Sequence, residues 1–123
     1  MTQRRAPHTA PPTVDTGALE VLASRRRYFA TVPERDLLAQ VLAVAQMYRW
    51  RTYHTHTSRH SAAGFPDLTM VRGNRLVFAE LKRVGKAATA DQRGWLVDLA
   101  CVPGVEAYVW TAEDLDMAAK VLA

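Results

Sequence analysis

Residues 64–82 read GFPDLTMVRGNRLVFAELK and predict a two-stranded β-hairpin. The apolar runs LTMV and LVFA have the length and composition of strands, and the dipeptide Gly73-Asn74 lies between them. Glycine readily takes the positive φ that a two-residue hairpin loop needs. With this loop, Asp67 on the first strand faces Glu80 on the second, and their Cβ atoms are expected to lie about 5 Å apart.

The hairpin is expected to bring two carboxylates and a lysine to one face of the sheet. Lys82 lies two residues beyond Glu80, and side chains two positions apart on a strand share a face. Two carboxylates this close repel each other unless one is protonated or a cation lies between them. Carboxylate oxygens are preferred ligands of Mg²⁺ and Mn²⁺, so Asp67 and Glu80 are candidate metal ligands. The alternative is a turn aspartate with an exposed Glu80–Lys82 pair that contributes roughly 0 to 1 kcal/mol, which leaves the facing acids unexplained.

At these residues the chain resembles the PD-(D/E)xK nucleases, through Pro66-Asp67 and Glu80-Leu81-Lys82. The segments GFPDL, FAELK and DQRGWL more narrowly resemble the stand-alone VRR-NUC domains of phages and bacteria. The resemblance covers residues from Pro33 to Leu115. It implies a restriction-endonuclease-like core, a Mg²⁺ or Mn²⁺ cofactor, a homodimer, and endonucleolytic hydrolysis of DNA phosphodiesters. Branched DNA, including Holliday junctions, is among the substrates that it implies.

The resemblance also implies a role for each residue of the motif. Asp67, Glu80 and the carbonyl oxygen of Leu81 would bind the metal. Lys82 would orient or activate the attacking water.

Two further residues match the family by position, and each has a structural alternative. Glu34 matches the upstream acid and would be a catalytic residue and a second-metal ligand, but the dipole of a helix also favours an acid in its first turn. One metal and two metals are therefore both open. Gln92 matches the catalytic glutamine that follows the hairpin. However, Thr89-Ala90-Asp91-Gln92 has the form of a capping box, in which Gln92 would fold back onto the helix start.

The positive charge is concentrated around the hairpin, as expected for a surface that binds a polyanion such as DNA. Residues 49–93 carry nine Lys or Arg and three acids, whereas the whole chain has a net charge of +4. The residues expected to contact DNA are His54, His56, Arg59, Arg83, Lys86 and Arg93. His54 or His56 is alternatively a proton-transfer group. Zinc binding is disfavoured because the histidine spacing fits no finger pattern and Cys101 is the single cysteine.

Two alternatives concern the function of the protein, and a third concerns the role of an arginine run near the N-terminus. A nucleic-acid-binding or assembly subunit without catalysis would explain the basic segment, but it would not need the facing acids. An RNA nuclease would share the same site. The run Arg25-Arg26-Arg27 is either the solvated end of a helix or an arm that binds phosphate.

The 123 residues, 49% of them hydrophobic, predict one domain of the α/β class. We divide the chain into a flexible tail at residues 1–15, an N-terminal extension at 16–32 whose helical character is ambiguous, and a nuclease-like domain at 33–123. The predicted αβββαβ order plus a terminal helix gives a mixed central sheet flanked by helices. The fourth strand is expected to run parallel to the third, because a helical crossover joins them. The predicted bounds are a helix from Pro33 to Tyr48, a strand from Trp50 into His54, a helix ending at Cys101 and a strand at Val105–Trp110.

Two further predictions concern the environment of the single cysteine and the cellular location of the protein. Cys101 cannot form an internal disulfide and is expected to be a small core residue. The sequence contains no run of about 18 apolar residues and no signal-peptide pattern. We therefore expect a protein of the cytoplasm of a bacterial or phage-infected cell, with no membrane partner.

Overall fold

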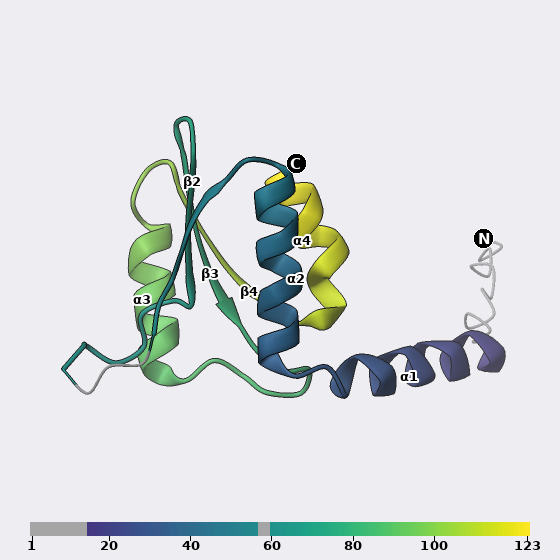
Figure 1. Ribbon diagram of the computed structural model, residues 1–123. Helices are drawn as coiled ribbons and strands as arrows, with labels where there is room; N and C mark the ends of the chain where they lie inside the picture. The colour runs from purple at the N-terminus through teal and green to yellow at the C-terminus, as the bar shows by residue number, and fades with distance from the viewer. Residues whose placement is uncertain (1–14, 57–59) are drawn as a thin grey trace, which may run out of the picture.

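The computed structural model of the chain describes residues 15–56 and 60–123. These residues form an α/β arrangement in three layers, with one sheet between α2 and α4 on one face and α3 on the other (Figure 1). The elements are α1 (Thr16–Ala30), α2 (Glu34–Met47), β1 (Arg51–His54), β2 (Leu68–Arg72), β3 (Arg75–Leu81), α3 (Ala90–Ala100), β4 (Val105–Trp110), the 3-10 turn η1 (Ala112–Asp114) and α4 (Leu115–Leu122). The predicted order of strands and helices is confirmed.

The sheet has the order β1-β2-β3-β4 and is mixed. Strands β1, β2 and β3 are antiparallel neighbours, whereas β4 runs parallel to β3, as the helical crossover predicted. The hairpin register is also confirmed, because Arg72 faces Arg75 and Leu68 faces Ala79. Gly73 has a φ of 58°, which permits the tight turn. Asp67 and Glu80 are the next pair outward in this register.

The main hydrophobic core lies on the sheet face covered by α2 and α4. Leu37, Val41 and Ala45 form one stripe of α2, and they pack with alternate residues of β2 and β3. The remaining members of this core are Trp50, Leu68, Met70, Val77, Ala79, Leu81, Trp110, Ala118 and Leu122. Because Ala79 and Leu81 point into this core, Glu80 between them must point to the opposite face, the one that α3 covers.

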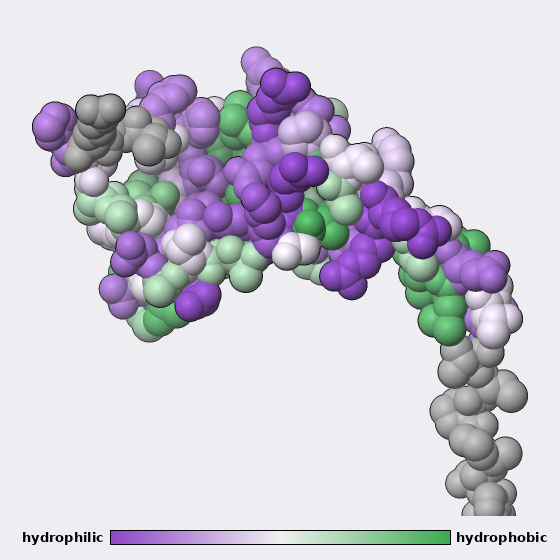
Figure 2. All heavy atoms as spheres, turned by 90° about the horizontal axis from the view of Figure 1, so that it is seen from below, coloured by the Kyte–Doolittle hydropathy of each residue, from purple (hydrophilic) through white to green (hydrophobic). Residues whose placement is uncertain are grey.

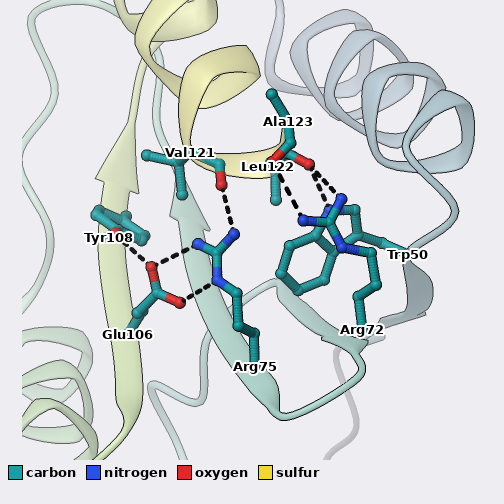
Figure 3. Close-up of polar contacts among 8 residues, drawn as sticks. All are labelled: Trp50, Arg72, Arg75, Glu106, Tyr108, Val121, Leu122 and Ala123. Atoms are coloured by element: carbon teal, nitrogen blue, oxygen red, sulfur yellow. Dashed lines mark hydrogen bonds and ion pairs between the residues drawn. The ribbon is translucent and has the colours of Figure 1, made fainter.

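Two arginines at the turn end of the hairpin have structural partners (Figure 3). Arg72 donates a hydrogen bond of 2.9 Å to the carbonyl oxygen of Leu122. Arg75 donates two hydrogen bonds, of 2.9 and 2.8 Å, to the carboxylate of Glu106. Both guanidinium groups also lie over the Trp50 ring, at 4.6 and 5.0 Å from its centroid. These two positive charges therefore hold α4 and β4 to the hairpin.

Two expectations for the domain need correction. Cys101 is exposed rather than buried; it is the C-cap of α3, a helix in which no residue is buried. Pro33 precedes α2 as its N-cap, with φ −66° and ψ 155°, so it is not the first helical residue.

The N-terminal extension forms α1, which projects away from the sheet (Figure 1). Asp15 accepts a hydrogen bond of 2.9 Å from the Gly17 N–H and so caps this helix. Asp15, which was assigned to the predicted tail, therefore belongs to the cap of α1, and the rest of that segment, residues 1–14, lies outside the described ranges. Arg25, Arg26 and Arg27 are exposed on α1. Over the described residues, none of the helices has the length and apolar character needed to span a bilayer.

Candidate functional site

Asp67 and Glu80 lie at the end of the hairpin that is opposite to its turn. Asp67 Oδ2 accepts a hydrogen bond of 2.8 Å from the Leu81 N–H, which fixes its carboxylate beside β3. Continuing the hairpin register places Pro66 opposite Leu81, and proline has no N–H to donate. The Leu81 carbonyl oxygen therefore receives no ladder hydrogen bond from that position. Because residue 66 is a proline, the Leu81 carbonyl oxygen lacks this hydrogen bond and lies beside Asp67 and Glu80.

Glu80 is buried, and its two oxygens have different surroundings. Oε1 accepts a hydrogen bond of 2.9 Å from Gln92 Nε2 and lies 3.7 Å from Lys82 Nζ. Oε2 is buried and has no hydrogen-bond partner among the described residues. The side chains of Glu80 and Lys82 are only 3% and 13% exposed, so the alternative of a surface ion pair is excluded.

Burial, followed by the neighbouring charge of Asp67 and a side-chain hydrogen bond with Asp67, raises the pKa of Glu80 to about 7, although the charge of Lys82 opposes the rise. A carboxyl with this pKa is about half protonated at neutral pH. When it is protonated, the proton relieves the repulsion between the two acids. A divalent cation can take the place of that proton, because it also neutralises the charge of both carboxylates. The carboxylate pair is therefore a candidate site for a divalent cation, whose binding would compete with that proton.

Gln92 both completes the predicted capping box and reaches the carboxylate of Glu80. Its Oε1 accepts a hydrogen bond of 2.8 Å from the Thr89 N–H, which completes the capping box at the start of α3. Its Nε2 donates to Glu80 at the same time. Gln92 can form both hydrogen bonds because its side-chain amide has an oxygen that accepts and a nitrogen that donates. The start of α3 is thereby joined to the carboxylate pair.

Gly64 is a residue whose importance the sequence reasoning missed. It has a φ of +91°, and a Cβ at this position would lie 2.5 Å from the main-chain carbonyl carbon of Asp91. The loop before Asp67 can approach the first turn of α3 only because Gly64 lacks a side chain. A glycine directly before the Phe-Pro-Asp segment was the available signal, since close backbone approach is one reason for glycine in a loop.

Glu34 lies at the same cleft as Asp67. This cleft has a volume of about 220 Å³, and its walls include Glu34, His54, Asp67 and the Leu81 region. Glu34 is exposed in the first turn of α2, so its carboxylate is accessible to a ligand in the cleft. The structure thus brings the upstream acid and the hairpin acid to one opening.

The available ligands match a hard cation. Within residues 15–56 and 60–123, no three His, Cys, Asp or Glu side chains form a group that could hold a metal by themselves. The donors at the site are instead Asp67, the unpartnered Oε2 of Glu80 and the carbonyl oxygen of Leu81. Mg²⁺ and Mn²⁺ prefer such oxygen donors and commonly complete their coordination with water or substrate phosphate.

The residues expected to contact DNA have different surroundings. His54 lines the cleft with Glu34, and His56 lines a larger pocket on the other side of Asp67; the two imidazole rings lie 4.7 Å apart. Arg83 and Arg93 each donate to a main-chain carbonyl, at 3.1 and 2.6 Å. The remaining two are Lys86, which is exposed, and Arg59, which lies outside the described ranges.

The end of the sheet that carries the acids is largely polar. Figure 2 views the molecule from this end, and hydrophilic side chains cover the centre of that face. Comparison of the chain with protein-family models, with curated proteins and with solved structures finds no match. The case for a function therefore rests on the chemistry of the carboxylate pair and its neighbours.

Proposed function

We propose that this chain is a Mg²⁺- or Mn²⁺-dependent endonuclease that hydrolyses DNA phosphodiester bonds. The observation that carries the proposal is the buried Oε2 of Glu80, which has no hydrogen-bond partner within residues 15–56 and 60–123 and belongs to a carboxylate paired with Asp67. Burying a carboxylate without a partner costs free energy, and a bound cation would offset that cost. We further propose that the α/β arrangement is a restriction-endonuclease-like core of the VRR-NUC type.

In this mechanism Asp67, Glu80 and the Leu81 carbonyl would hold the metal ion. When bound, a divalent cation polarises the scissile phosphate and lowers the pKa of a coordinated water. Lys82, 3.7 Å from Glu80 Oε1, is placed to orient the attacking water or to stabilise the negative charge that builds on the phosphate. Gln92 keeps the Glu80 carboxylate in one orientation through its hydrogen bond. Glu34 is available for a second ion at the shared cleft.

DNA is the proposed substrate because Lys82 lies beside Glu80 and Arg35 lines the cleft that Asp67 also lines, and branched DNA follows from the motif resemblance. Two exposed cations are available to the phosphate backbone: Arg35, which lines the cleft and lies 3.7 Å from Asp36, and Lys86, in the loop after β3. A homodimer is part of the proposal, since a two-fold partner would bring a second site to the opposite strand. Light scattering tests this part: a mass of one chain would contradict it.

Cleavage assays test the proposed function directly. Supercoiled plasmid, linear duplex, a four-way junction and an RNA of matching sequence are incubated with the protein and either Mg²⁺ or Mn²⁺. We expect Asp67→Asn and Lys82→Met to lower the rate by about 100-fold or more. Asp98→Asn and Lys120→Met are the matched controls, because both residues are exposed and neither contacts the site. Equal rates for wild type and the two site variants would disprove the assignment.

Metal binding separates the nuclease from a subunit that only binds nucleic acid. Titration calorimetry with Mn²⁺ is expected to give binding to wild type and to Asp98→Asn, and none to Glu80→Gln. A non-catalytic subunit would bind DNA without cleaving it and would bind no Mn²⁺ at this site. Cleavage of the RNA but not of the DNA would change the substrate and leave the chemistry intact.

A further inference from the structure

A pocket of about 610 Å³ opens on the side of Asp67 away from the Glu34 cleft. It lies between the end of β1, the loop that leads to Asp67 and the start of α3. Asp67 and Gln92 line it, so anything bound there would touch the candidate site. Its volume is within the range of about 300 to 1,000 Å³ that is usual for small-molecule sites.

Aromatic side chains form much of the pocket wall. Tyr53 is 65% exposed on β1, and the Thr55 N–H donates to the Asp67 carbonyl at 2.8 Å, which continues the β1–β2 ladder. The period of two along β1 then puts Tyr53, Thr55 and Asp67 on the same sheet face. Tyr53 is exposed there because α3 packs over β4, at the other edge of the sheet.

The opposite wall is held in place. Phe65 and Trp95 meet edge to face with ring centroids 5.1 Å apart, and Trp95 Nε1 donates a hydrogen bond of 3.2 Å to the Ala63 carbonyl. A hydrogen-bonded indole packed on a second ring has little freedom to reorient. The pocket therefore presents a preformed aromatic wall on one side and an accessible tyrosine on the other.

The charge of the pocket indicates which part of a nucleotide it suits. Among the described residues that line it, Asp67 is charged and none is Lys or Arg. Among the described lining residues, a phosphate group would find no Lys or Arg to bind it. The cleft on the other side of Asp67, in contrast, includes Arg35. The aromatic side chains of this pocket suit an uncharged planar group, because every nucleobase has a face that can stack on an aromatic ring.

We propose that this pocket holds one unstacked base of the nucleic acid, next to the phosphate that lies at Asp67 and Glu80. The proposal rests on the proposed nuclease function and specifies its substrate class: strands with an unpaired nucleotide at the cut, such as single strands, flaps and branch points. A fully paired duplex must first expose a base, which costs a few kcal/mol. We expect intact duplex to bind roughly 10- to 100-fold more weakly than the same strand unpaired.

Abasic scanning tests the pocket through binding alone. Fluorescence anisotropy measures the affinity of Lys82→Met protein for single-stranded oligonucleotides in which each position in turn lacks its base. We expect one position, or two adjacent ones, to weaken binding by about 5- to 100-fold when abasic. Adding Tyr53→Ala should weaken binding of the intact strand by a similar factor and remove the sensitivity at that position. Tyr28→Ala is the matched control, because Tyr28 is 67% exposed and lies on α1, away from the pocket.

The possible results separate the two proposals. A uniform effect of abasic positions, or the same sensitivity with Tyr53→Ala, overturns the base pocket. If the wild-type protein still cleaves DNA in that case, the nuclease assignment stands alone. A base-sensitive position removed by Tyr53→Ala, in a protein that never cleaves, supports the pocket and refutes the nuclease. Failure to bind any of the nucleic acids overturns both.

Discussion

The buried carboxylate Glu80 makes a prediction about stability that does not depend on activity. In the folded protein its pKa is raised from 4.5 to about 7, whereas the unfolded chain releases the proton near 4.5. Between these values the folded state binds more protons than the unfolded state. The free energy of unfolding must therefore fall as the pH rises from about 4.5 to about 7, and it stays lower above that range.

Glu80→Gln removes this titration while keeping nearly the same shape. A tenfold change in an equilibrium corresponds to about 1.4 kcal/mol, so the full pKa rise corresponds to about 3 kcal/mol. We expect the variant to gain about 3 kcal/mol relative to wild type when the pH is raised from about 4.5 to 8. Urea unfolding of both proteins in EDTA, at each pH, gives the four free energies needed.

Glu106→Gln is a control with the opposite sign. The hydrogen bonds from Arg75 lower the pKa of Glu106, so its ionised form stabilises the fold above its ordinary pKa. This variant should lose stability relative to wild type at pH 8, and the difference should shrink as the pH falls through the lowered pKa. If the difference between Glu80→Gln and wild type is the same at both pH values, the argument from burial and from Asp67 is wrong.

Three other substitutions probe the scaffold around the site. Gly64→Ala would place a Cβ 2.5 Å from the Asp91 carbonyl carbon, and we expect a loss of about 2 kcal/mol or more in urea unfolding together with weaker Mn²⁺ binding. Arg49→Gly should stabilise the protein by about 1 kcal/mol in the same measurement, because Arg49 follows the C-cap of α2 with a φ of 64° that glycine adopts without strain. Trp50→Phe removes the 2.7 Å hydrogen bond to the Leu122 carbonyl, and a loss of about 2 kcal/mol is expected in thermal or urea unfolding. Unchanged stability in any of the three contradicts the contact on which it depends.

The hairpin was predictable because its determinants are local. A glycine that can take positive φ and two apolar runs of the same length set the register, and the register alone placed Asp67 opposite Glu80. The capping box at Thr89 was predictable for the same reason, since its partners lie within one turn.

Predictions that depended on contacts between residues distant in the sequence were wrong or were left open. Cys101 was expected in the core because apolar residues surround it in the sequence, but it is the C-cap of α3, a helix without a buried residue, and its thiol is exposed. The helical state of residues 16–30 was ambiguous because α1 has no strong apolar periodicity.

The sequence by itself determined that two carboxylates and a lysine share one face of a hairpin, because strand alternation and turn chemistry are properties of consecutive residues. Only the tertiary structure decided that Glu80 is buried, that Gln92 reaches it from α3, and that an aromatic pocket lies beside Asp67. These features arise where α3 packs over one half of the sheet and leaves the other half open. Burial and electrostatics depend on which elements meet in space, and local residue patterns do not specify those long-range contacts.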